Sequence, residues 1–139
     1  MKTLALTIAF IISVFTASAQ ETKGQTLTVT IDNVMNQNGN VIFALHTQDT
    51  FMKTSGVQTE VSEIEDGKAK VTFKNVASGT YAILTLHDEN QNKRMDFLPN
   101  GMPKESYGLS NNPILYGPPT FEAAKFEVTD EDKEIAIRF

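Results

Sequence analysis

Short apolar stretches that alternate with polar residues at period two recur along the chain, separated by turn-forming residues. These stretches are residues 25–33, 40–47, 57–64, 69–76, 80–87, 121–129 and 134–139. Because successive side chains of a strand point to opposite faces, this period predicts strands with one buried face. No window of a dozen residues keeps the 3.6-residue period of a helix. The expected fold class is all-β: an antiparallel β-sandwich of about seven strands with one long ordered loop, and a small barrel as the alternative.

The first two stretches illustrate the pattern. In Gln25–Asn33 and Asn40–Thr47, apolar residues alternate on either side of a segment rich in Asn and Gly, which favours a turn. We therefore expect these two strands to form an antiparallel hairpin. Thr80–His87 is the most hydrophobic of the later stretches and is expected to be a central strand.

The amino terminus has the pattern of a secretory signal peptide. Lys2 precedes an almost wholly apolar run, Leu4–Val14, and Ala17-Ser18-Ala19 is a small-residue cleavage site. We expect residues 1–19 to be removed and residues 20–139 to form a single domain without a transmembrane segment, in the periplasm or outside the cell. The alternative is an uncleaved anchor. The chain has no cysteine, which excludes disulfides, thiolate chemistry and a lipidated cysteine.

Charge and motifs exclude several functions. A net charge of −5 without a basic stripe makes the chain a poor candidate for binding nucleic acid. Nucleotide-binding loops, nucleophile elbows and paired metal-binding histidines are absent from the sequence, so no catalytic residues are assigned and the chain is not expected to be an enzyme. The only histidines, His46 and His87, stand at the ends of predicted strands. We interpret them as structural histidines rather than metal ligands.

One stretch, His87–Pro113, departs from the alternating pattern and is rich in Asp, Asn, Gly and Pro. Asp88, Asn90, Asn92 and Asp96 occupy positions 1, 3, 5 and 9 of a calcium-loop pattern, and Arg94 could offer its backbone carbonyl at position 7. Ca²⁺ takes six to eight hard oxygen ligands. The spacing therefore makes residues 88–96 a candidate Ca²⁺ site.

The same stretch departs from the pattern at two positions. Lys93 stands at position 6, where the loop normally has glycine, and Pro99 stands at position 12, where a bidentate glutamate is expected. Glu105 is the candidate for the missing carboxylate. With few formal charges, such a site would be weak, roughly 10⁻⁴–10⁻³ M. The alternative, which the residues leave open, is a loop in which Asp and Asn side chains bond their own backbone.

Two further hypotheses remain open. A hydrolase could use His87, Asp88 and Glu105 in a cleft beside the long loop, provided that the three groups lie within a few ångströms of one another. Alternatively, a sheet edge could pair with an envelope assembly. The partner itself is not identified by the sequence; an envelope protein or a carbohydrate is the class we expect.

The long loop also carries a family resemblance. His87-Asp88-x-Asn90-x-Asn92, Asp96 and the run from Gly101 to Asn112 resemble the signature of a secreted bacterial family, domain of unknown function 2141. Phe73, Val76, Gly79 and Tyr81 match the strand before that loop, and the resemblance extends over Leu27 to Phe139. It implies an exported protein without an established activity. The Gly-x-Tyr strand is also similar to those of transthyretin-like and carboxypeptidase-regulatory β-sandwiches, which are mostly accessory or binding modules.

Overall fold

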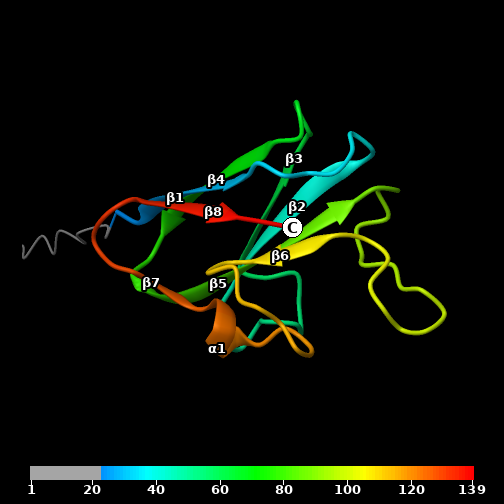
Figure 1. Cartoon of the computed structure of the whole chain (residues 1–139). Helices are drawn as coiled ribbons and strands as arrows, with labels where there is room; N and C mark the ends of the chain where they lie inside the picture. Colours follow the sequence, from blue (N-terminus) through cyan, green and yellow to red (C-terminus); the bar gives the residue numbers. More distant parts are fainter. Residues whose placement is uncertain (1–22) are drawn as a thin grey trace, which may run out of the picture.

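Residues 23–139 are described by the structure, a computed structural model, and they contain eight strands and one short helical turn (Figure 1). The elements are β1 (Gln25–Ile31), β2 (Asn40–His46), β3 (Gln58–Ser62), β4 (Ala69–Val76), β5 (Gly79–Asp88), β6 (Tyr107–Leu109), α1 (Phe121–Ala124), β7 (Phe126–Val128) and β8 (Lys133–Ile137). One sheet has the order β4-β1-β8, and the other has the order β3-β2-β5-β6 with β7 also paired to β5. The predicted all-β sandwich is confirmed, and β5 is its central strand.

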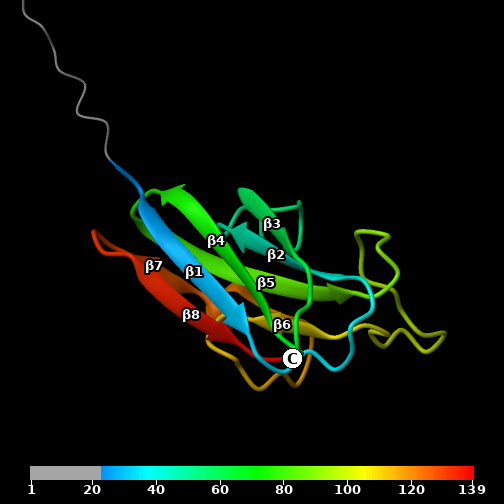
Figure 2. The ribbon, with the colours of Figure 1, turned by 90° about the horizontal axis from the view of Figure 1, so that it is seen from above.

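The predicted hairpin of the first two strands is wrong. β1 pairs with β4 and β8 in one sheet, whereas β2 pairs with β3 and β5 in the other (Figure 2). The connection over residues 32–39 is much longer than the two-residue turns that favour hairpins, so it can cross from one sheet to the other. The pairing is also not wholly antiparallel, because β8 runs parallel to β1.

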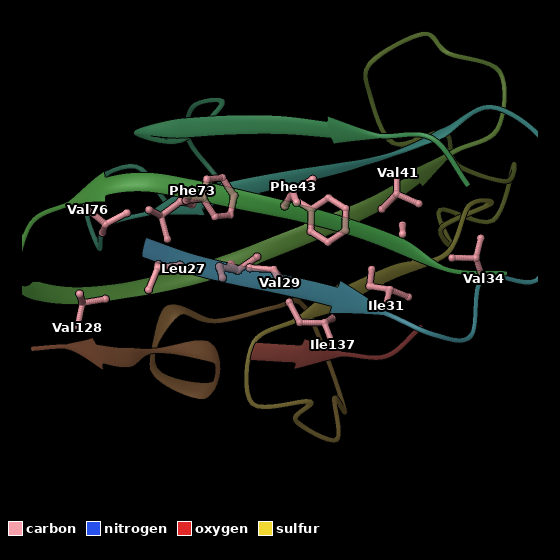
Figure 3. Close-up of a cluster of buried hydrophobic side chains, with 14 residues drawn as sticks. Leu27, Val29, Ile31, Val34, Val41, Phe43, Phe73, Val76, Val128 and Ile137 are labelled. Atoms are coloured by element: carbon pink, nitrogen blue, oxygen red, sulfur yellow. The ribbon is translucent and has the colours of Figure 1, made fainter. Parts of the chain in front are cut away.

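The main core lies between the two sheets and is built by the alternating residues. Figure 3 shows side chains of β1, β2 and β4 pointing toward one another, with Phe43 and Phe73 filling the space between the sheets. Leu27, Val29 and Ile31 have no exposed surface. At about 25 cal/mol per Å² of buried apolar surface, this layer is the main stabilising contribution to the fold.

A second, smaller apolar cluster covers the opposite face of β5. Phe51, Ala82, Leu109 and Ala124 form it, and residues after β6 supply the cover. Here the prediction of a strand over residues 121–129 is half wrong: Phe121–Ala124 is a helical turn, and only Phe126–Val128 is a strand. The hydroxyl of Thr120 accepts a hydrogen bond from the backbone N–H of Ala123, which starts the helical turn.

Side chains bridge the edges of the two sheets. The amide of Gln58 donates to the carbonyl of Lys74, and the hydroxyl of Ser62 accepts from the N–H of Lys70, so β3 is tied to β4. At the other side, the amide of Asn112 donates to Ala136 and accepts from the N–H of Arg138. These contacts occupy backbone groups that pairing with another chain would need.

The predicted signal peptide, residues 1–19, lies outside the described residues. Within residues 23–139, no helix has the length and apolarity needed to cross a membrane.

Candidate functional site

The loop between β5 and β6, residues 89–106, projects from one end of the sandwich in both views (Figure 1, Figure 2). The β1–β2 connection lies against its base, because the Nε2 of His87 donates to the carbonyl oxygen of Asn38 at 2.8 Å. Gly39 follows with a φ of 66°. A Cβ at this position would collide with the carbonyl oxygen of Asp88. The two connections therefore fit together because residue 39 has no side chain.

Asp88, at the end of β5, folds the first turn of the loop. Its side chain is fully buried, and its two carboxylate oxygens accept hydrogen bonds from the backbone N–H groups of Asn92 (3.1 Å) and Lys93 (2.7 Å). Gln91 and Lys93 both adopt a left-handed backbone, with φ of 59° and 64°. Lys93 thus takes the conformation for which a calcium loop uses glycine, and the hydrogen bonds to Asp88 hold it there.

Glu105 closes the loop from its other end. It is only 6% exposed. One carboxylate oxygen accepts from the N–H of Glu89 at 3.0 Å, and the other accepts from the N–H of Asp96 at 3.1 Å. The ladder in which Leu86 pairs with Tyr107 runs on toward the loop, so Glu105 lies opposite Asp88. The sequence made Glu105 the candidate for a missing metal ligand; in the structure, its oxygens contact backbone N–H groups.

Asp96 is bonded to the two asparagines of the candidate site. The side-chain amide of Asn90 donates to it at 2.6 Å, and that of Asn92 donates to both of its oxygens at 3.0 Å. The oxygen of Asn92 accepts from the N–H of Arg94, and the oxygen of Asn90 accepts from the N–H of Asn92. These backbone donors fix the orientation of both amides, because a reversed amide would place N–H against N–H.

The structure brings Asp88, Asn90, Asn92, Asp96 and Glu105 into one hydrogen-bonded network. Among residues 23–139, however, no group of three or more acidic or histidine side chains is arranged to hold a metal ion. A bound Ca²⁺ would need the two asparagine amides to turn their oxygens toward Asp96. The calcium site is therefore still a prediction.

A family model described as "uncharacterized protein conserved in bacteria (DUF2141)" matches residues 29–136. The chain belongs to this family. The match confirms the family resemblance that the loop motif indicated. No curated protein matches the chain.

Among solved structures, this DUF2141 chain is similar to the pilus-presented adhesin Spy0125 (Cpa). It is 14% identical to one crystal form, with a TM-score of 0.29, and 13% identical to a cysteine variant, with a TM-score of 0.26. In both comparisons the match covers 83% of this chain and 26% of the adhesin chain. The chain thus spans about a quarter of the length of these structures.

The two histidines of the DUF2141 chain are both buried and lie apart. His87 faces the interior and stacks on Phe139, with ring centroids 6.1 Å apart. Its Nε2 donates to a carbonyl, whereas its buried Nδ1 has no hydrogen-bond partner within residues 23–139. Strand alternation turns His87 to the face opposite Asp88 and Glu105. The grouping of His87, Asp88 and Glu105 that a hydrolase requires is therefore not present.

His46 lies near the other end of the sheet, where it pairs across from Ala82. Its Nδ1 is 3.3 Å from the hydroxyl of Thr50, and its ring packs edge-on against Phe51. Desolvation by burial lowers the pKa of His46, while a hydrogen bond with the backbone of Thr50 acts in the opposite direction. Both histidines are thus buried and packed against aromatic rings, and a purely structural role for them stays a prediction.

A hollow of about 420 Å³ lies beside the network, lined by Asn38, Gly39, Glu89, Asn90, Asp96, Lys104 and Glu105. Beyond it, the end of the loop exposes apolar side chains that sequence reasoning missed: Phe97 is 61% exposed, Leu98 43% and Met102 59%. The sequence does contain a signal for these exposed residues, because they flank a Pro-Asn-Gly turn in an otherwise polar segment.

Proposed function

We propose that this chain is an exported, non-catalytic binding module, and that the loop over residues 89–106 is its recognition surface. The observation that carries the proposal is the use of two buried carboxylates, Asp88 and Glu105, to bind backbone N–H groups within the loop. A loop fixed in this way loses little conformational freedom when a partner binds, which favours affinity. Loops held by a rigid sheet commonly carry binding functions.

The histidine contacts support a non-catalytic role. His87 uses its Nε2 to hold the β1–β2 connection and stacks on Phe139 inside the sandwich. Asp88, Asp96 and Glu105 therefore have no imidazole base beside them, and their carboxylate oxygens are engaged in hydrogen bonds. The expected partner is a component of the cell envelope, consistent with the signal-peptide pattern of residues 1–19.

Photo-cross-linking in the exporting cell tests this function. A photoreactive phenylalanine analogue at Asn100, exposed in the loop, is compared with the same analogue at Glu60, exposed on β3. Mass spectrometry then identifies adducts of protein, glycan or lipid. We expect adducts with envelope components at position 100 and few at position 60. Equal labelling at both positions, or hydrolysis of ester, peptide or glycoside substrates that depends on Asp88 and Glu105, would contradict the proposal.

A second candidate function is weak Ca²⁺ binding by Asp88, Asn90, Asn92, Asp96, Glu105 and the carbonyl of Arg94. The observation that favours it is the left-handed Lys93, whose φ of 64° is the conformation that position 6 of a calcium loop needs. Calorimetric titration with Ca²⁺ and thermal melting with and without chelator test it. The absence of both heat and a melting shift at millimolar Ca²⁺ would exclude the site.

A further inference from the structure

The outer end of the loop is an ordered apolar hairpin. The N–H of Leu98 donates to the carbonyl of Met102, and the N–H of Lys104 donates to the carbonyl of Asp96, each at 2.8 Å. Phe97 pairs with Pro103 across the hairpin. We name Phe97, Leu98 and Met102 the apolar tip. All three residues are exposed although the backbone that carries them is hydrogen-bonded, so their exposure is a feature of a folded segment.

Three cations flank the apolar tip in the sequence. Lys93, Arg94 and Lys104 are all exposed, and none of them forms an ion pair within the described part of the chain. Of the acidic residues in the same loop, Glu105 is buried against backbone N–H groups, and Asp96 is half-buried and held by two asparagine amides. Glu89, at the base of the loop, is exposed. Beside the apolar tip, the exposed charged side chains are therefore cations, on a chain whose net charge is −5.

We propose that the apolar tip inserts into the surface of an anionic lipid layer while Lys93, Arg94 and Lys104 contact lipid phosphates. This inference rests on the proposed role of the loop as recognition surface and names its partner. Apolar side chains that enter the headgroup region together with flanking cations are the elements of interfacial membrane binding. The exposed cations beside the tip complement the charge of an anionic lipid surface.

The position of the tip fits this partner. The loop projects beyond the sheets, so the tip can enter a lipid surface before the rest of the domain contacts it (Figure 1). Gly101, at the turn of the hairpin, has no atom within 4 Å of the place where a Cβ would stand. A side chain at this point of the turn would therefore meet open space.

Because the sequence contains no tryptophan, the fluorescence of a single introduced tryptophan reports on its own surroundings alone. The variant Phe97→Trp places a single indole in the tip, and Tyr116→Trp places one at a residue that is 96% exposed in a different loop. Both variants are prepared without residues 1–19, so that the apolar leader cannot bind lipid. The strands and both apolar clusters lie within residues 23–139, so the shortened chain retains the fold.

Each variant is mixed with vesicles of phosphatidylglycerol and phosphatidylcholine, or of phosphatidylcholine alone. We expect Phe97→Trp to show a blue-shifted emission and to co-sediment with the anionic vesicles only, with binding that weakens at high salt. Tyr116→Trp should bind equally well, since its tip is intact, but its emission should not shift. Each of Lys93→Gln, Arg94→Gln and Lys104→Gln should weaken binding about fivefold.

A triple variant, Phe97→Ser, Leu98→Ser and Met102→Ser, should lose binding, while the control Met35→Ser, at a residue 81% exposed elsewhere, should retain it. The inference is overturned if the emission of Phe97→Trp does not shift to the blue at millimolar lipid. It is also overturned if this variant binds neutral vesicles as well as anionic ones. If the vesicle experiments fail but cross-linking at position 100 gives loop-specific protein or glycan adducts, only the proposal of a lipid partner is overturned. Failure of both experiments would overturn the proposed function as well.

Discussion

Asp88 and Glu105 hold the projecting loop from its two ends, each with both of its carboxylate oxygens bonded to backbone N–H groups. Asp88 binds the N–H groups of Asn92 and Lys93, and Glu105 binds those of Glu89 and Asp96. Hydrogen bonds to charged acceptors are each worth about 1.5–3 kcal/mol. The loop is therefore held by interactions that are individually testable.

Replacing Glu105 by Gln should lower the free energy of unfolding by about 1–3 kcal/mol, because an amide N–H₂ would face a backbone N–H in place of an acceptor. Urea unfolding of the variant measures the change. Glu89→Gln is the matched control, since that side chain is exposed, and it should alter stability by less than about 0.5 kcal/mol. Similar effects from the two variants would show that the carboxylate of Glu105 does not hold the loop.

Gly39 and Gly101 form a matched pair for testing how the two connections fit together. Both have a positive φ, but a Cβ at Gly39 would collide with the backbone of Asp88, whereas Gly101 has open space around it. Gly101→Ala should cost only the conformational penalty, about 1–2 kcal/mol. Gly39→Ala should cost more than about 4 kcal/mol or prevent folding. Equal costs in chemical denaturation would argue against the close approach.

The left-handed Lys93 gives a backbone prediction. Lys93→Gly should leave stability unchanged or raise it by up to about 1 kcal/mol, because glycine adopts a positive φ without steric cost. Lys93→Val should lower stability by about 1–2 kcal/mol, since a β-branched residue disfavours this conformation. Denaturation midpoints compare the two variants. A stabilising valine would contradict the assigned conformation.

His46 predicts a dependence of stability on pH. Its pKa in the folded chain lies below the ordinary value of 6.5, because burial disfavours the charged imidazole. As the pH falls through 6.5, the unfolded chain therefore binds a proton before the folded chain does, and stability decreases. Unfolding from about pH 7.5 to about pH 5.5 should show this loss, above the range in which carboxylates titrate. His46→Gln should flatten the profile, and an unchanged slope would exclude His46 as its source.

The local alternation of residues was sufficient to predict much of the fold. Leu27, Val29 and Ile31 are buried as the period indicated, because one face of β1 meets the core. The pairing of β1 was not predictable in this way, since its partners Phe73 and Ile135 are distant in sequence. β6 was missed because three residues are too few to show a period.

The sequence pointed to the residues that form this network but left their bonding open between an ion and the backbone. Asp88, Asn90, Asn92 and Asp96 do gather in one turn, because alternate side chains of a tight loop share a side. Their spacing could not decide between an ion and the backbone, since both use the same oxygen atoms. The apolar tip was not predicted, because the prediction for this stretch rested on oxygen ligands alone and left out Phe97 beside the turn.

The exchange rates of the loop amides test the central claim most directly. Amide hydrogen exchange of Asn92, Lys93 and Asp96 is followed by NMR in the presence of chelator, with Gly101 as an internal comparison. These three N–H groups donate to the carboxylates of Asp88 and Glu105. We expect them to be protected without any ion and to change little when millimolar Ca²⁺ is added. Rapid exchange in chelator, with protection only after Ca²⁺ is added, would contradict a loop that its own carboxylates hold.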